Sequence, residues 1–205
     1  MTATRRPEVL YITATDRRNG EAGLSPDARI VVGVLARDMN VSLAIAGPID
    51  HQSLQSLRDH FAPLRAAGGF PGSSAHQRAA RGLRGLSSAQ LGSDIVNARL
   101  QAAIQRRSAD FDAIVIDELV AAPYLPVQVS CPVYFVAHRA EAPSQQGAGW
   151  QKWWRPGRRA LANAERALLE RVTGVFAQPE VASLLLARGM PLSQLNPSFG
   201  QFRAE

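Results

Sequence analysis

The chain has 205 residues, of which 46% are hydrophobic and 20% are charged, and its mean hydropathy is −0.10. These values are typical of a globular protein and argue against a disordered or membrane-spanning chain. No run approaches the roughly 20 apolar residues that span a bilayer. The opening segment "MTATRRPEVLYI" lacks the apolar core of a signal peptide, so we expect a cytoplasmic protein.

The charge is strongly basic, with a net value of +6 and an isoelectric point near 10.6. A basic surface attracts phosphates. However, Lys152 is the only lysine among the 23 basic residues, which indicates a compositional bias toward arginine. Seven arginines against one acid, Asp94, lie between Arg65 and Arg107. We therefore expect a local anionic partner and no nucleic acid, and steep salt dependence of DNA binding would indicate otherwise.

Strand and helix patterns alternate in the first third of the chain. The residues "EVLYIT" (8–13) form a β-branched and aromatic run that predicts a strand. A helix is predicted over 25–39, with Ser25 as N-cap and Pro26 at its first position. A second strand is predicted over 41–47, before Gly-Pro. A second helix is predicted over 49–64, with an apolar stripe of Leu54, Leu57, Phe61 and Leu64.

The alternation continues after a segment rich in glycine and serine (66–88), which predicts a loop with one short helix. A helix over 87–107 is predicted to have Leu91, Ile95, Ala98 and Ala102 on one stripe. The remaining predicted elements are strands over 110–117, 132–138 and 174–178, a short helix over 118–125, and helices over 156–171 and 179–188, with Gly189 just beyond the end of the last helix.

This alternation predicts a doubly wound, Rossmann-like α/β domain, with a mostly parallel sheet covered by helices on both faces. Ligands of such sheets bind beyond the carboxyl ends of the strands. The loops after Thr13, Gly47, Asp117 and Ala137 are therefore candidate sites. The run "CPVYFVAHRAE" delivers His138 and then Glu141 to this edge.

Stronger signatures of chemistry are missing. The sequence has no G-x-G-x-x-G, no phosphate-binding G-x-x-x-x-G-K-[ST], and no G-x-S-x-G. The histidines, at positions 51, 60, 76 and 138, do not have metal-ligand spacing. The single Cys131 cannot form an internal disulfide and reads as a buried structural thiol. We expect no metal and no cofactor.

Three segments between residues 108 and 190 carry a family resemblance: "FDAIVIDELVAAPYL", "CPVYFVAHRAE" and "ALANAERALLERVTGVFAQPEVASLLLARG". Their order and spacing resemble the second half of the N-terminal domain of retaining GT-B glycosyltransferases, which use nucleotide-sugar donors. In that family one strand ends in Asp before a helix, and the next ends in a His followed closely by Glu. The resemblance implies one Rossmann-like, acceptor-binding domain over 1–205.

Residue roles follow from this resemblance. It implies that His138 is catalytic and faces the transferred sugar, where its imidazole can hydrogen-bond a hydroxyl. Glu141 would orient the same loop. Asn19 and Gly20 would approach acceptor and donor phosphates through backbone N–H groups, although the family's paired glycines are missing.

Asp117 and Glu118 are implied binders of an acceptor hydroxyl, with helix-terminal acids as the alternative interpretation. Two departures from the family pattern stand out. Gln178 replaces the family's usual serine, and the sequence stops at Glu205 where the family enters its donor-binding domain. We therefore expect that domain to be absent and the chain to bind a nucleotide sugar only with a second domain or subunit.

The segment "GWQKWWRPGRR" (149–159) interleaves tryptophans with cations, as peripheral segments at anionic membranes do. It predicts a position at the inner face of the membrane, and the alternative is that the tryptophans pack under the following helix. The residues of this predicted surface are Trp150, Lys152, Trp153, Trp154, Arg155, Arg158 and Arg159.

The function implied by the resemblance is acceptor binding in a glycosyltransferase that moves a sugar to a saccharide or lipid-linked acceptor. The activity would require the missing half. The alternative is a non-catalytic scaffold or regulatory module that has kept the fold.

Overall fold

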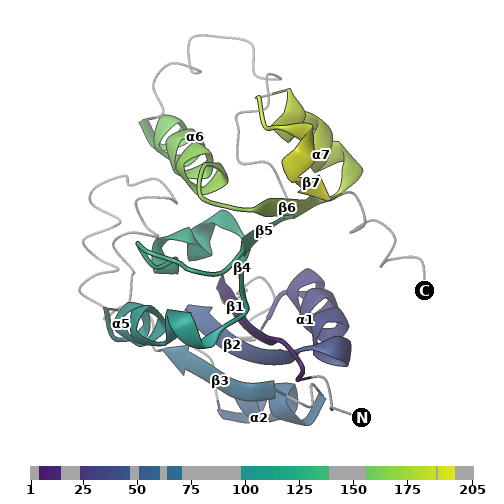
Figure 1. Cartoon of the computed structure of the whole chain (residues 1–205), viewed down its shortest axis with the longest axis vertical. Helices are drawn as coiled ribbons and strands as arrows, with labels where there is room; N and C mark the ends of the chain where they lie inside the picture. Colours follow the sequence, from purple (N-terminus) through teal and green to yellow (C-terminus); the bar gives the residue numbers. More distant parts are fainter. Residues whose placement is uncertain are drawn as a thin grey trace.

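A computed structural model describes residues 5–14, 24–46, 51–60, 64–70, 98–138, 156–187 and 189–196. Within these ranges the chain forms one parallel sheet of seven strands in the order β3-β2-β1-β4-β5-β6-β7 (Figure 1). The predicted doubly wound α/β class is confirmed. The strands are β1 (Glu8–Ala14), β2 (Asn40–Ala46), β3 (Leu64–Phe70), β4 (Ala113–Asp117), β5 (Val133–Ala137), β6 (Gly174–Ala177) and β7 (Leu195–Asn196).

The helices divide between the two faces according to the direction in which the chain travels. From the central β1 the chain moves outward to β3, then returns and continues from β4 to β7. Because parallel crossovers are right-handed, opposite directions place the helices on opposite faces. One face carries α1 (Pro26–Asp38) and α2 (His51–His60). The other carries α5 (Ala98–Arg107), the 3₁₀ helix η2 (Leu119–Tyr124), α6 (Pro156–Leu169) and α7 (Pro179–Leu186).

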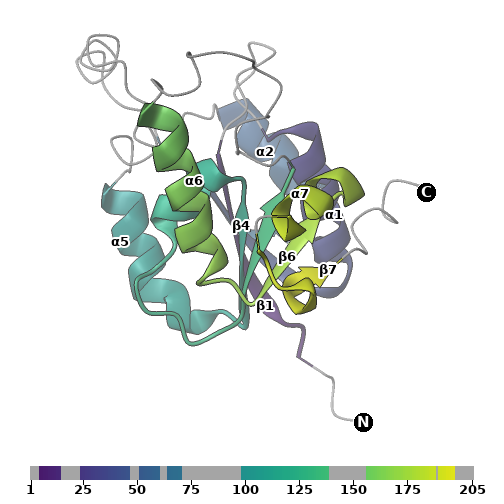
Figure 2. The same cartoon turned by 90° about the horizontal axis from the view of Figure 1, so that it is seen from above.

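Two apolar clusters fill the space between the helices and the sheet. Alternate strand residues, such as Ile114 and Ile116, face α5 and α6, while Val115 faces α1. Figure 2 shows α5 and α6 on one side of the strands and α1 on the other. The alternation follows from the two-residue period of a strand. None of the helices in the described ranges is long and apolar enough to cross a bilayer.

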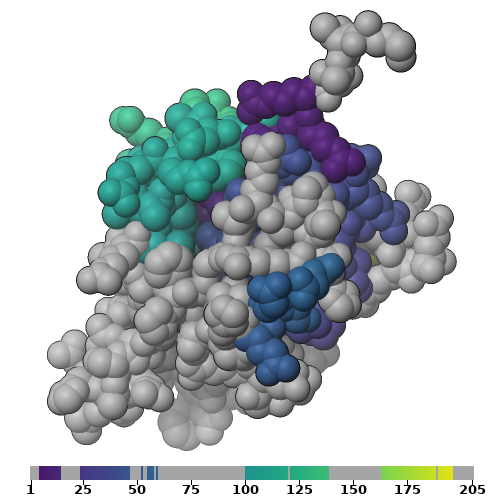
Figure 3. All heavy atoms as spheres, turned by 90° about the horizontal axis from the view of Figure 1, so that it is seen from below, coloured from purple at the N-terminus to yellow at the C-terminus, as the bar shows by residue number. Residues whose placement is uncertain are grey.

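Hydrogen bonds from polar residues join the amino-terminal ends of the central strands. The backbone N–H of Glu8 donates to Asp112 Oδ2 at 2.8 Å, and Asn40 Nδ2 donates to Glu8 Oε1 at 2.9 Å. In Figure 3 the first described residues, in purple, lie against residues coloured teal, which belong to the described range 98–138. These contacts fix β1, β2 and β4 at the end opposite to the predicted ligand edge.

The start of the predicted glycine-rich loop is instead a strand. Residues 66–70 belong to β3, which pairs in parallel with β2, for example Ser42 with Ala66. Pairing with β2 has overridden the low strand propensity of Gly68 and Gly69, which is tolerated at a sheet edge. The helix prediction over 49–64 also ran too far, because α2 ends at His60 and Leu64 begins β3. The remainder of the predicted glycine-rich loop, residues 71–88, lies outside the described residues.

Three smaller expectations also need correction. In α5 the buried side chains are Leu100 and Ile104, whereas Ala102 of the predicted stripe is exposed. Cys131 is half-buried at the edge of the core, not fully buried. The two-residue strand β7 was not predicted, because it is too short to produce a pattern.

The predicted N-cap of α1 is confirmed, and it provides a test of stability. Ser25 Oγ accepts a hydrogen bond from the Ala28 N–H at 3.1 Å. We expect Ser25→Ala to lower the free energy of unfolding by about 1 kcal/mol, since one N–H at the helix start loses its partner. Urea denaturation measures the change. Ser25→Asp serves as the control and should retain most of the stability; equal losses in both variants would contradict the capping role.

Candidate functional site

Three neighbouring strands bring polar side chains together at the carboxyl edge of the sheet. Asp117 is the last residue of β4, His138 follows β5 directly, and Thr13 lies near the end of β1. His138 Nε2 lies 2.6 Å from Asp117 Oδ1, and Thr13 Oγ1 donates to Asp117 Oδ2 at 2.9 Å. The Asp117 side chain is fully buried, and the His138 side chain is 10% exposed. Both oxygens of a buried carboxylate are therefore engaged.

The cluster lies on the face of the sheet that α1 covers. Asp117 and His138 follow Val115 and Val136 by two residues, and both valines pack in the α1 cluster. Asp27, in the first turn of α1, places its Oδ2 3.8 Å from His138 Nδ1. This distance is too long for a hydrogen bond but short enough for a strong charge interaction. The imidazole of His138 thus lies between two carboxylates.

These carboxylates determine the ionisation of His138. Burial by itself would lower the pKa of His138, but the hydrogen bond to Asp117 and the charges of Asp117, Asp27 and Glu118 outweigh it. The net result is a pKa raised above the ordinary value of 6.5. At a given pH the site therefore favours the imidazolium more than water does, and an imidazolium donates from both nitrogens and can act as an acid.

Tyr11, on β1, adds a buried phenol to this cluster. Its hydroxyl forms no hydrogen bond of normal geometry within the described residues. Burial, followed by the nearby Asp117 carboxylate, raises the pKa of Tyr11 well above its ordinary value. The phenol therefore stays protonated and remains a donor.

Backbone strain accompanies the cluster. Glu118, directly after Asp117, has a φ of 65°, in the left-handed region that non-glycine residues seldom adopt. Its N–H donates to the Val136 carbonyl at 3.3 Å, which joins β4 to β5 at their carboxyl ends. Such strain costs about 1–3 kcal/mol and is concentrated at functional sites.

Of the site residues predicted from the sequence, the structure brings His138 and Asp117 into contact and places Glu118 beside them. Asn19, Gly20 and Glu141 lie outside the described residues. So do Trp150, Lys152, Trp153, Trp154 and Arg155. Arg158 and Arg159 lie in α6, but their side chains are not among those described. The membrane-surface interpretation stays a prediction.

Sequence reasoning missed three members of the cluster. Thr13 is predicted only as the end of a strand, and Asp27 lies within the helix predicted over 25–39 with no further role. Tyr11 was counted as part of an apolar run. One signal could have indicated Tyr11 and Thr13: polar groups at alternate positions near the carboxyl end of a predicted central strand. No group of three or more His, Cys, Asp or Glu in the described part of the chain could hold a metal ion.

Neither a known protein family model nor a curated protein matches this sequence. Solved structures do match the fold. A Listeria monocytogenes protein assigned as a UDP-N-acetylglucosamine 2-epimerase has a TM-score of 0.51 at 12% identity, covering 95% of this chain and 45% of that protein. The UDP-GlcNAc 2-epimerase of Neisseria meningitidis bound to UDP-GlcNAc gives 0.49 at 14% identity, covering 92% and 44%. Anabaena HepE in complex with UDP gives 0.49 at 13% identity, covering 92% and 43%.

The chain spans less than half the length of these proteins. At 12% identity, the match to the Listeria monocytogenes structure shows the fold alone, a Rossmann-like α/β arrangement. The assignment of this chain to one half of a GT-B enzyme stays a prediction. The matches do not distinguish a retaining glycosyltransferase from other enzymes of this architecture.

The raised pKa of His138 can be measured by following the imidazole Cε1–H resonance against pH. We expect a midpoint above 6.5 in the wild type. Asp27→Asn should lower the midpoint, because it removes one of the negative charges that favour the imidazolium. Asp38→Asn, at the other end of α1, is the matched control and should leave the midpoint unchanged. A wild-type midpoint at or below 6.5 would contradict the arrangement.

The same ionisation makes stability depend on pH with a defined sign. Because the folded-state pKa of His138 is raised, its contribution to stability is fully present below the unfolded pKa of about 6.5 and is lost as pH rises through the folded pKa. We expect the difference in unfolding free energy between wild type and His138→Gln to shrink across this window. Urea titrations at a series of pH values measure it, and the other histidines cancel because both proteins share them. A difference that is constant or grows with pH would refute the linkage.

Proposed function

We propose that this chain is the sugar-binding half of a GT-B type enzyme that uses a nucleotide sugar. More specifically, we propose an acceptor-binding domain of a glycosyltransferase that moves a sugar to a saccharide or lipid-linked acceptor. A second domain or subunit would bind the donor. The observation that carries the proposal is the His138–Asp117 pair, at the sheet edge where doubly wound domains bind their ligands.

In this proposal His138 is the group that contacts the sugar. A hydroxyl that approaches from the side of Asp27 can accept a hydrogen bond from Nδ1 and donate one to the Asp27 carboxylate. Asp117 acts as a positioning residue, because its bond to Nε2 fixes the plane of the imidazole. Thr13 in turn holds the second oxygen of Asp117. A charged donor of this kind forms stronger hydrogen bonds than a neutral one.

The fold comparison fits this proposal. This chain covers 45% of the Listeria monocytogenes protein, which leaves room for a second domain in a complete enzyme. The assigned substrate of that protein is a nucleotide sugar. A scaffold or regulatory module that kept one half of the fold is the alternative. It predicts no saccharide binding at the His138 edge.

Saccharide binding to the chain provides the test. We expect methyl glycosides of glucose, galactose, mannose or N-acetylglucosamine to shift the His138 resonances in NMR titrations. His138→Ala should weaken the binding by about tenfold or more, since a hydrogen bond from a charged group is lost. Arg37→Ala, in the last turn of α1, is the control and should leave the affinity unchanged.

Two results would count against the proposal. If none of these saccharides binds, the scaffold alternative is favoured. If calorimetry shows tight binding of UDP-N-acetylglucosamine to this chain alone, the assignment to the acceptor half is wrong, because the donor would then not need a second domain.

A further inference from the structure

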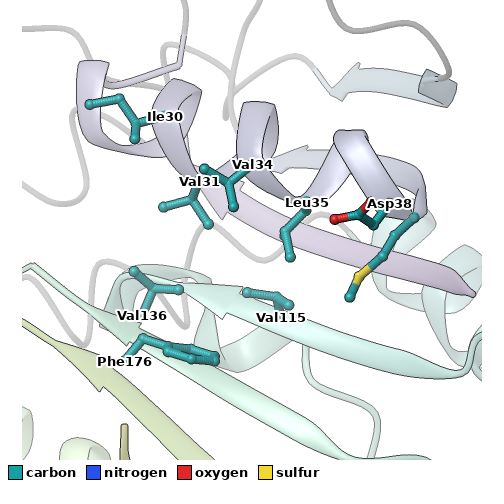
Figure 4. A pocket seen from close by; sticks show the side chains of 9 residues that line it. Ile30, Val31, Val34, Leu35, Asp38, Val115, Val136 and Phe176 are labelled. Carbon is teal, nitrogen blue, oxygen red and sulfur yellow. The ribbon is translucent and has the colours of Figure 1, made fainter. Parts of the chain in front are cut away.

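A groove of about 230 Å³ lies between α1 and the strands β4, β5 and β6. Its walls are apolar side chains that face one another in Figure 4. Asp38, at the far end of α1, is the one charged residue that lines it. The main contributors are Val31, Val34 and Leu35 from α1, and Val115, Val136 and Phe176 from the strands.

The groove follows from the chain topology. The buried residues of α5, α6 and α7 all belong to the cluster on the opposite face. In the described part of the chain, α1 and α2 are the helices on this face, and they follow β1 and β2. Beyond α1, no helix among the described residues covers the apolar side chains of β5 and β6 on this face, although parallel sheets normally bury both faces.

The groove and the polar cluster are built on the same elements, α1, β4 and β5. Along β4 and β5, Val115 precedes Asp117 and Val136 precedes His138 on the same face, a step of about 7 Å. Along α1, Asp27 and Val31 lie one turn apart on one stripe, a rise of about 6 Å. The same two walls thus carry polar groups at one end and apolar side chains along the rest.

From this shared placement on α1, β4 and β5 we infer that the site takes an amphiphilic glycoside, a hydroxylated ring bearing an apolar alkyl or aryl group. The ring lies against His138 and Asp27, and the apolar group enters the groove beneath α1. The inference rests on the proposed function and specifies its acceptor. The volume is sufficient, because an apolar cavity of about 150 Å³ in another protein binds benzene.

The test compares octyl and methyl glycosides of the same four sugars, with each octyl compound kept below its micelle concentration. We expect the octyl form of the bound sugar to bind at least about tenfold more tightly, since each buried methylene adds about fourfold in affinity. Val34→Trp, which fills the groove from α1, should abolish this gain and leave the methyl glycoside unchanged. Ile30→Trp, at the exposed rim, should do the same with less risk to folding.

Val127→Trp is the matched control, because Val127 is 86% exposed and lies away from the groove. This variant should keep the full gain in affinity of the octyl glycoside over the methyl glycoside. Equal affinity for octyl and methyl forms would overturn this inference while leaving the proposed function intact. If the octyl glycoside still binds more tightly than the methyl glycoside in both groove variants, the inference is also overturned, because the octyl group would then bind outside the groove. Failure of every methyl and octyl glycoside to bind would remove the proposed function as well.

Discussion

A fully buried carboxylate at the end of β4 constrains the structure around it. Removing an ionised aspartate from water costs several kcal/mol unless charge and hydrogen bonds compensate. Thr13 on β1 and His138 after β5 provide that compensation for Asp117, so one side chain ties three strands together at their carboxyl ends. The position of His138 is therefore fixed by the compensation that the buried Asp117 requires.

The topology places this carboxylate where the sheet changes direction. The chain moves from β1 toward β3 with α1 on one face, and from β4 toward β7 with η2 and α6 on the other. The helix that follows β1 and the 3₁₀ helix that follows β4 lie on opposite faces, the arrangement at which doubly wound sheets bind their ligands. The hydrogen bond between Thr13 and Asp117 crosses this switch point. The general rule for doubly wound sheets and the particular cluster of this chain thus indicate the same edge.

Much of this arrangement could be predicted from the sequence, because it depends on local signals. Alternating apolar runs indicated the parallel sheet, and the polar exit of one run indicated His138. The contacts of His138 with Asp117 and Asp27 join residues 21 and 111 positions apart, and no local pattern encodes such pairs. β3 escaped prediction for a similar reason: its glycines disfavour a strand locally, and only pairing with β2 stabilises it.

Helix α1 contributes to both the polar cluster and the apolar groove. Its first turn holds Asp27 beside His138, and its next turns form one wall of the apolar groove. A ligand that moves α1 relative to the strands would change the distance between Asp27 and His138, and with it the pKa of the imidazole. Linkage is reciprocal, so protonation of His138 would change the affinity of the groove by the same factor. The apolar and polar parts of the site are therefore expected to act as one unit.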